Sequence, residues 1–243
     1  MKMSLHLPIS LMILSSIFLF MACAALRDNW RMQGIDFQGF PTNIIGESSQ
    51  VLLVRNMNPA SVDVQVLALD KRAGHWQSPF ATMEGVIGKN GFAPPGEKRE
   101  GDGRTPSGIF PLGTIFGYEP SFPTRMPYRQ ATVDDLWVDD VHADDYNRWV
   151  KSGATNASSF ERMRREDDLY KYGIVVEYNT NPVIKGYGSA IFFHLWKGMG
   201  EPTEGCIALS EENLVRVIKW LDPAARPLVV MGGTKEMIEG HRK

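Results

Sequence analysis

The 243-residue sequence is short of cysteine, of net charge and of long apolar runs. It has only two cysteines, Cys23 and Cys206, too few for the disulfide framework of a small secreted scaffold. Its formal net charge of −2 gives no support for nucleic-acid binding, which usually needs a basic face. An apolar fraction of 43% and a charged fraction of 22% are ordinary for a globular protein. No internal repeat is visible, so we expect one folded domain with a substantial core.

The strongest apolar segment lies at the N-terminus. Lys2 supplies one positive charge, and the apolar stretch 9–25 ends in small residues. This pattern is typical of a secretory signal, and the stretch is marginal for a membrane span, which needs about 20 apolar residues. We therefore expect residues 1–24 to be a signal peptide and the mature protein to be exported, to the periplasm or cell envelope.

The signal segment can end in two ways. Ala22-Cys23-Ala24 matches the small-x-small pattern of ordinary cleavage, whereas a cysteine directly after the apolar run resembles a bacterial lipoprotein site. In the second case a lipid on Cys23 would be the only membrane contact. Either way Cys206 has no disulfide partner, and an unpaired cysteine in an exported protein is a liability unless its thiol is used or deeply buried.

The pattern after the signal peptide predicts a mainly β domain with one or two helices. Residues 25–49 lack periodicity and are expected to be a tether, 50–233 the domain, and 234–243 a tail. Ser158 and Ser210 each precede a segment that could be a helix, over 161–170 and 211–221. Residues 88–113, dense in Gly and Pro, predict a surface loop that serves as a lid or a spacer. The expected strands cover residues 50–56, 61–72, 76–87, 136–140, 172–179, 189–196 and 226–233.

The stretch FFHLWKGMGEPTEGCIALS contains a histidine and the unpaired cysteine. If the strands that hold His194 and Cys206 were antiparallel neighbours, the imidazole could withdraw the thiol proton and the thiolate could attack a carbonyl. Gly205 permits close backbone approach, and the N–H groups of Gly205 and Cys206 could stabilise an oxyanion. A free cysteine is often simply buried, however, and a strand histidine is often structural. Spacing alone leaves both interpretations open.

The same stretch resembles the active-site region of the YkuD-type L,D-transpeptidase catalytic domain. The signature of that family is a histidine, a spacer and then Ser/Thr-x-Gly-Cys, which His194 and the tetrapeptide 203–206 match. The segment GDGRTPSGIFPLG resembles a second family motif through Asp102, Thr105, Pro106, Gly108 and Phe110. The resemblance covers residues 50–231, and the two motifs occur in the family's order.

The resemblance implies a β-rich fold and a cysteine acyltransferase that acts on peptidoglycan stem peptides, cleaving after diaminopimelate. Cys206 would be the nucleophile, His194 the general base, and the carbonyl of Leu195 the group that orients the imidazole. Thr203 and Glu204 would lie near the substrate. No metal or cofactor is implied. Transfer to an amine, hydrolysis by an L,D-carboxypeptidase or amidase, and a non-catalytic cell-wall-binding module all remain open, as does the oligomeric state.

The sequence departs from the family pattern at two positions. Glu204 stands where the family usually has histidine, and Ala208 stands where it usually has arginine. A carboxylate that faced the sulfur would disfavour the thiolate, so we expect Glu204 to point to solvent or to bond a substrate amine. The missing arginine removes a clamp for a substrate carboxylate.

Overall fold

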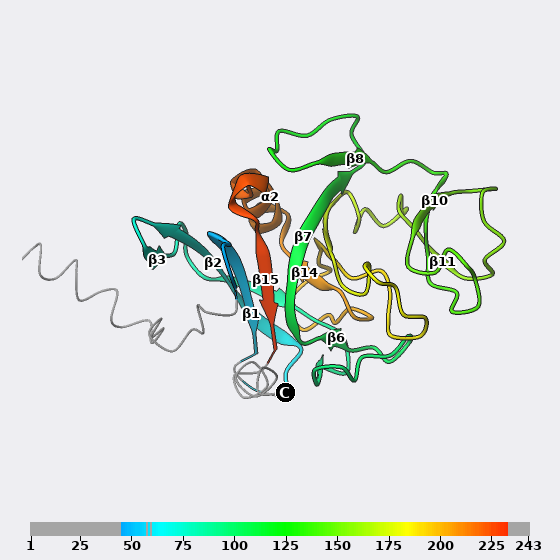
Figure 1. Cartoon of the computed structure of the whole chain (residues 1–243), viewed down its shortest axis with the longest axis horizontal. Coiled ribbons are helices and arrows are strands. Elements are labelled where there is room, and N and C mark those ends of the chain that lie inside the picture. Colours follow the sequence, from blue (N-terminus) through cyan, green and yellow to red (C-terminus); the bar gives the residue numbers. More distant parts are fainter. Residues whose placement is uncertain (1–44, 57, 59, 233–243) are drawn as a thin grey trace, which may run out of the picture. The chain divides into compact units, whose positions relative to one another are not determined.

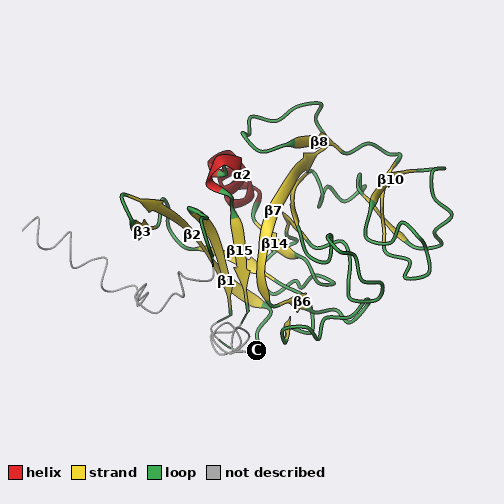
Figure 2. Cartoon of the chain, viewed as in Figure 1, coloured by secondary structure: helices red, strands yellow, loops and turns green. Residues whose placement is uncertain are grey.

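A computed structural model describes residues 45–56, 58 and 60–232. The predicted signal peptide, most of the tether and the tail (234–243) lie outside the described residues. Within them the mainly β prediction is confirmed, with strands predominating and α2 as the one α-helix (Figure 2). The elements are β1 (Gln50–Arg55), β2 (Asp63–Arg72), β3 (His75–Gln77), β4 (Met83–Val86), β5 (Phe92–Ala93), β6 (Thr105–Pro106), β7 (Gly108–Gly117), β8 (Tyr128–Gln130), β9 (Asp135–Val138), β10 (Trp149–Lys151), β11 (Phe160–Arg162), β12 (Tyr172–Val176), β13 (Phe192–Leu195), β14 (Ile207–Leu209), α2 (Glu211–Trp220), a 3-10 turn (Pro223–Ala225) and β15 (Leu228–Met231).

The main sheet closes on itself. Its strand order is β1-β15-β7-β12-β13-β14-β4-β2, and β2 also pairs with β1, so the pairing returns to its starting strand. Figure 1 shows β1, β15 and β7 side by side, which brings the first and last described strands together. Closure leaves the ring strands without a free edge, so their backbone groups pair within the domain.

Helix α2 packs its apolar face on the main core. Ser210 caps it as the sequence predicts, because its hydroxyl accepts a hydrogen bond from the N–H of Asn213 at 3.3 Å. Leu214, Val217 and Ile218 are fully buried in the same cluster as the inward side chains of the strands. Full burial of one such side chain contributes roughly 1.5–3 kcal/mol, so this face holds the helix on the sheet.

A separate three-stranded sheet, in the order β10-β9-β11, lies between β8 and β12 in the sequence. A second apolar cluster joins it to the main sheet through Trp137 on β9, Phe116 on β7 and Phe192 on β13. Cys206 belongs to this second cluster. The nucleophile candidate therefore lies at the junction of the two sheets.

The predicted helix over 161–170 is wrong. Residues 160–162 form β11 instead, paired antiparallel with β9. Ser158 does not cap a helix, because its hydroxyl donates to Asp140 at 2.7 Å and its N–H to the same carboxylate at 2.8 Å. These contacts fix the chain as a strand beside β9, and tertiary pairing overrides the local charge pattern.

Two further boundaries differ from the sequence prediction. The strand expected over 76–87 is split into β3 and β4. The loop expected over 88–113 ends earlier, because Gly108 already begins β7, a strand that pairs with β15 and β12. The Gly- and Pro-rich composition concealed a central strand, as backbone pairing does not require large side chains.

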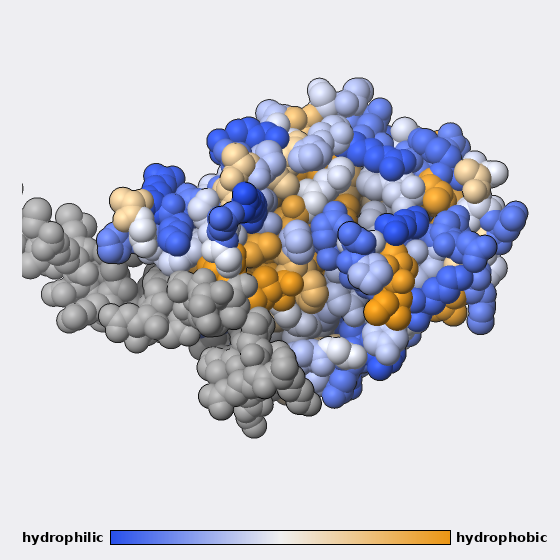
Figure 3. Space-filling view, viewed as in Figure 1, coloured by the Kyte–Doolittle hydropathy of each residue, from blue (hydrophilic) through white to orange (hydrophobic). Residues whose placement is uncertain are grey.

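The visible face of the described residues is mostly hydrophilic, with apolar residues in small separate groups (Figure 3). In the part of the chain that the structure describes, the exposed large apolar side chains are Val133, Ile184, Tyr187 and Met199. Among the described residues, no helix is long and apolar enough to cross a membrane.

Candidate active site

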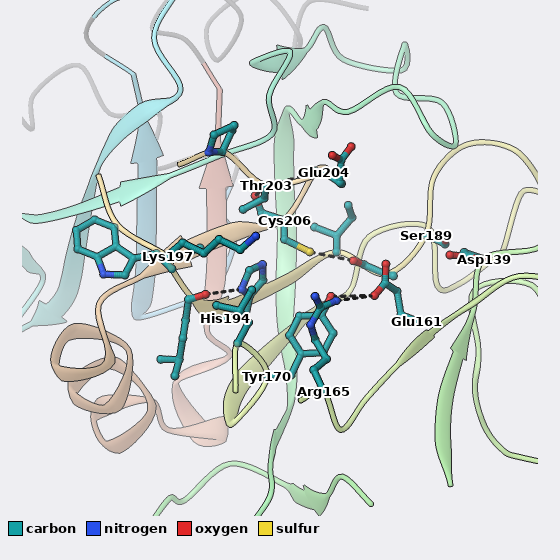
Figure 4. Close-up of a pocket in the computed structure, with 18 of the residues that line it drawn as sticks. Asp139, Glu161, Arg165, Tyr170, Ser189, His194, Lys197, Thr203, Glu204 and Cys206 are labelled. Atoms are coloured by element: carbon teal, nitrogen blue, oxygen red, sulfur yellow. Dashed lines mark hydrogen bonds and ion pairs between the residues drawn. The ribbon is translucent and has the colours of Figure 1, made fainter. Parts of the chain in front are cut away.

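His194 and Cys206 lie on neighbouring strands that are parallel. His194 pairs with Ala208 in the register of β13 and β14, and Cys206 stands two residues before Ala208. Residues two apart on a strand face the same side, so the imidazole and the thiol share one face (Figure 4). The antiparallel arrangement expected from the sequence is wrong, but the parallel one also brings the two residues together.

The connection between the two strands, residues 196–206, makes this parallel pairing geometrically feasible. A parallel pair needs a crossover of about a dozen residues, whereas two residues suffice for a hairpin. The connection is anchored midway by a bridge between Thr203 and Gly88, with Thr203 donating its N–H to the carbonyl of Ile87 at 3.0 Å. The chain then enters β14 with Cys206 directly before it.

The imidazole of His194 is held by its own strand. Nδ1 lies 2.7 Å from the carbonyl oxygen of Leu195, and only an Nδ1–H can donate to that acceptor. Nε2 therefore keeps its lone pair, as a general base requires. The residue is only 7% exposed. Desolvation lowers the pKa of His194 to about 4, so the ring is neutral at neutral pH.

The thiol of Cys206 is also neutral at rest. It is buried, donates to the carbonyl of Ala190 at 3.1 Å and accepts from the N–H of Phe192 at 3.4 Å. Desolvation raises the pKa of the thiol to about 12, against the smaller opposing effect of the Phe192 N–H. The pair is thus a thiol beside a neutral imidazole, not a preformed thiolate–imidazolium ion pair.

The turn before Cys206 is held by the hydroxyl of Thr203. This oxygen donates to the carbonyl of Cys206 at 2.7 Å and accepts the N–H of Gly205 at 3.1 Å. The Gly205 N–H, expected from the sequence to face an oxyanion, is therefore already engaged. Gly205 has a φ of +145°, and a Cβ there would lie 2.9 Å from the carbonyl oxygen of Arg104. Glycine is required both by the conformation and by the close approach.

The Asp102–Thr105 segment supports the same turn. Thr105 is fully buried, and its hydroxyl donates to the Cys206 carbonyl at 3.3 Å while accepting the N–H of Gly88 at 2.9 Å. Asp102 accepts the N–H groups of Arg99 and Arg104 and pairs with the buried Lys98 at 2.6 Å. Asp102 thus orders the loop, and Thr105 connects the loop to the nucleophile candidate.

Glu204 and Ala208, the two residues that depart from the family pattern, differ in exposure to solvent. The side chain of Glu204 is 77% exposed and pairs with Lys89 Nζ at 2.7 Å. Its charge is therefore matched by a lysine, and Glu204 itself lines the cavity. Ala208 is buried, lines the cavity and is the partner of His194 in the register of β13 and β14.

A cavity of about 340 Å³ contains the pair. One wall comes from the connection 196–206, through Lys197, Glu201 and Thr203 among others. The opposite wall comes from the three-stranded sheet and the segment after it, with Asp139, Glu161 and Arg165 (Figure 4). Trp196 also lines the cavity, whereas Trp137 packs in the core.

The opposite wall carries a half-buried acid, Glu161, that the sequence analysis did not single out. Tyr170 packs edge-on against His194, with ring centroids 5.2 Å apart, and its hydroxyl lies 3.4 Å from Glu161. Desolvation raises the pKa of Glu161, and the nearby Arg165 opposes that shift. The signal was present in the charged run 161–170, but the helix prediction placed these side chains in solvent.

The acidic turn after β9 has a structural role. Asp140 accepts the N–H of His142 at 2.9 Å as well as the two Ser158 bonds. Within residues 45–56, 58 and 60–232, no group of three or more His, Cys, Asp or Glu side chains could hold a metal ion.

Comparison with known proteins gives one family match. The family model for the YkuD L,D-transpeptidase catalytic domain matches residues 67–231. No curated protein sequence matches the chain. Among solved structures, Bd1075 of Bdellovibrio bacteriovorus is 12% identical with a TM-score of 0.41, over 77% of this chain and 49% of that one. The helical cell shape determining protein Pgp2 of Campylobacter jejuni is 16% identical with a TM-score of 0.38, over 76% of this chain and 48% of that one. The chain spans about half the length of these structures.

Proposed function

The chain belongs to the YkuD family of L,D-transpeptidase catalytic domains, and we propose that it is an exported cysteine acyltransferase of the cell wall. Its donor substrate is a peptidoglycan stem tetrapeptide, cleaved after diaminopimelate. Cys206 forms a thioester with the donor and passes the acyl group to an amine.

The observation that carries the proposal is the tautomer of His194. Its Nδ1–H is bonded to the Leu195 carbonyl at 2.7 Å, inside the cavity that also contains the Cys206 thiol. This tautomer leaves Nε2 with a free lone pair on the face that the ring shares with the thiol. A free base nitrogen on the side of the nucleophile is one requirement of general-base activation.

The chemistry follows from the neutral pair. As Sγ attacks the donor carbonyl carbon, the S–H proton leaves its hydrogen bond to the Ala190 carbonyl and passes to Nε2 of His194, so thiol and imidazole need not ionise beforehand. The imidazolium then gives this proton to the departing amine as the C–N bond breaks and the thioester remains. An acceptor amine attacks the thioester carbonyl carbon and loses a proton to His194. As the C–S bond breaks, the imidazolium returns that proton to Sγ, which restores the Cys206 thiol.

The oxyanion formed in each step needs a hydrogen-bond donor. Because Thr203 engages the Gly205 N–H, we assign this role to the N–H of Cys206 itself. Thr203 and Thr105 both donate to the Cys206 carbonyl, and these bonds fix the orientation of the residue. Thr203 acts by holding the turn, and Glu204 lies at the rim.

The test uses the purified full-length chain with a tetrapeptide-stem muropeptide, with and without a D-amino acid as acceptor amine. The expected result is free D-alanine together with a product in which the D-amino acid replaces it. Free D-alanine with no exchanged product would replace transfer by hydrolysis. No product from the wild type, or undiminished product from Cys206→Ser, would defeat the proposal and favour a non-catalytic wall-binding module.

A further inference from the structure

Ala190, whose carbonyl accepts the Cys206 thiol, has a strained backbone. Its φ is +54°, in the left-handed region that residues other than glycine seldom adopt. Such a conformation persists only where the surroundings enforce it, and it is common at functional sites. The dashed line from the sulfur in Figure 4 marks the bond that this conformation permits, from Sγ to the Ala190 carbonyl at 3.1 Å.

Asn147 is hydrogen-bonded to the N–H of Ala190 and to three other groups. Its Oδ1 accepts the N–H of Ala190 at 3.2 Å and the indole N–H of Trp137 at 2.8 Å. Its Nδ2 donates to the carbonyls of Tyr178 and Asn179, at 3.2 and 2.7 Å. The residue is 1% exposed, and both of its side-chain polar atoms are engaged. Only an amide of this length both accepts and donates in this way.

Tyr146 and Ser189, the residues before Asn147 and Ala190, form a second connection between the same two segments. Tyr146 donates its hydroxyl to Glu100 at 2.5 Å, and Ser189 donates to the same carboxylate oxygen at 2.7 Å. The consecutive residues Tyr146 and Asn147 are thus bonded, through Glu100 and directly, to the consecutive residues Ser189 and Ala190.

We propose that Asn147 is a positioning residue for the nucleophile: it holds Ala190 in the left-handed conformation, and the Ala190 carbonyl holds the proton of the Cys206 thiol. The inference rests on the proposed function for its meaning, since the thiol positioned in this way is the one that forms the thioester. A hydrogen bond from the neutral thiol favours the protonated form, so the resting nucleophile stays an aligned thiol until a substrate carbonyl arrives.

The decisive variant is Asn147→Gly. Asn147 itself has a φ of +58°, which glycine adopts without strain, so this change removes the side-chain contacts while tolerating the backbone conformation. Every variant carries Cys23→Ser, which leaves Cys206 as the only thiol. Two quantities are measured on the purified full-length chain: turnover of the muropeptide, and the rate of Cys206 alkylation by iodoacetamide against pH.

The expected result is a ten- to hundredfold loss of turnover, on the order of what misplacement of a reacting group costs. The alkylation profile should move to lower pH by about one unit, since the bond that stabilises the neutral thiol is lost. The charged and titratable groups around the thiol are unchanged in the variant: His194, Glu161, Tyr170, Arg165, Lys98, Glu100 and Asp139.

A second glycine tests the strain directly. Ala190→Gly lets this position adopt the left-handed conformation without the help of Asn147, so the double variant should regain roughly fivefold or more of the lost turnover. If Asn147→Gly alone does not fold, the double variant is compared with Ala190→Gly, and turnover within about threefold of that single variant is expected.

Gln50→Leu is the matched control for loss of a buried amide. Gln50 is 5% exposed, and its amide bonds Trp220 and Asp222, away from the cavity. It should lower the melting temperature without moving the alkylation profile. An Asn147→Gly protein with wild-type turnover and profile, or a double variant that is no more active than the single one, would overturn the inference. If the wild type has no turnover, the proposed function fails, while the alkylation profile still tests the positioning.

Discussion

The hydroxyl of Thr105 donates to the main-chain carbonyl of Cys206 at 3.3 Å, across 101 positions of sequence. The same oxygen accepts the N–H of Gly88 at 2.9 Å, so one buried side chain joins three segments. The motif that contains Thr105 thereby supports the motif that contains Cys206. Thr105 fixes the backbone of the proposed nucleophile and, being fully buried, does not itself face the substrate.

Thr105→Val should damage stability and turnover together. Valine has nearly the same shape but leaves the Gly88 N–H and the Cys206 carbonyl without the hydroxyl, at a cost of about 1–3 kcal/mol of unfolding free energy. Chemical denaturation and muropeptide turnover measure the two effects. Thr105→Ser keeps the hydroxyl and should retain most of the activity. A greater loss in Thr105→Ser than in Thr105→Val would mean that methyl packing, and not the hydrogen bonds, is what matters.

Gly205→Ala should be far more harmful than Gly198→Ala. Both glycines have strongly positive φ, +145° and +150°, so the conformational strain is matched. Only at Gly205 does a Cβ meet backbone, 2.9 Å from the Arg104 carbonyl oxygen, whereas nothing lies within 4 Å at Gly198. We expect an extra destabilisation of about 1–3 kcal/mol, as for overpacking, and a loss of turnover. Similar melting temperatures for the two variants would contradict this account.

The reactivity of Cys206 towards iodoacetamide should be low at neutral pH and rise steeply with pH. The thiol has a pKa near 12 and alkylation requires the thiolate, so the rate should grow about tenfold for each pH unit through the neutral range. Enzymatic turnover should instead be nearly flat at neutral pH, because His194, with a pKa near 4, is already a free base. A turnover profile that tracks the alkylation profile would show that a preformed thiolate is the reactive species.

The free energy of unfolding should decline on both sides of neutrality. The pKa of His194 is about 4 in the folded protein, against an ordinary value of 6.5. Between pH 6.5 and pH 4 the unfolded chain therefore binds more protons than the folded one, and the free energy of unfolding falls by about 3 kcal/mol as the pH drops through this range. For Cys206 the pKa rises from 9.0 to about 12, so stability is full below pH 9 and is lost as pH rises towards 12. Denaturant titrations across pH measure both limbs, with His194→Gln as the control. An unchanged acid limb in that variant would be evidence against this contribution of the buried imidazole.

Glu204→Gln should leave the thiol almost unaffected. The carboxylate is exposed and paired with Lys89, so its removal should change stability by no more than about 1 kcal/mol and alkylation by less than about twofold. Glu161→Gln is the informative comparison, because this half-buried charge lies near the thiol and raises the pKa of the thiol. That variant should move the alkylation profile to lower pH. A larger shift from Glu204→Gln than from Glu161→Gln would place the unusual carboxylate at the sulfur after all.

The sequence predicted best what is decided locally. The Ser210 cap, the helix behind it and the strands now seen as β1 and β2 all follow from neighbouring residues, and all are observed. The pairing of β1 with β15 and of β7 with both β15 and β12 joins segments far apart, and no local periodicity encodes such partners.

The cavity was predictable only in part. His194 and Cys206 stood out because an unpaired cysteine is unusual in a chain that we expect to be exported, and because the two residues match the family motif. The wall that carries Glu161 and Arg165 was missed, since a charged run of alternating sign is typical of a solvent-facing helix. Only the pairing of β11 with β9 turns that run towards the thiol.

The connection between β13 and β14 has a consequence for how such a protein can diversify. Residues 196–206 form one wall of the cavity, while the hydrogen bonds between β13 and β14 fix the register of the proposed base and nucleophile. Insertions or replacements among residues 197–202 would therefore reshape the entrance without disturbing the reacting pair. This segment is the natural place to graft loops from relatives when a new acceptor preference is sought.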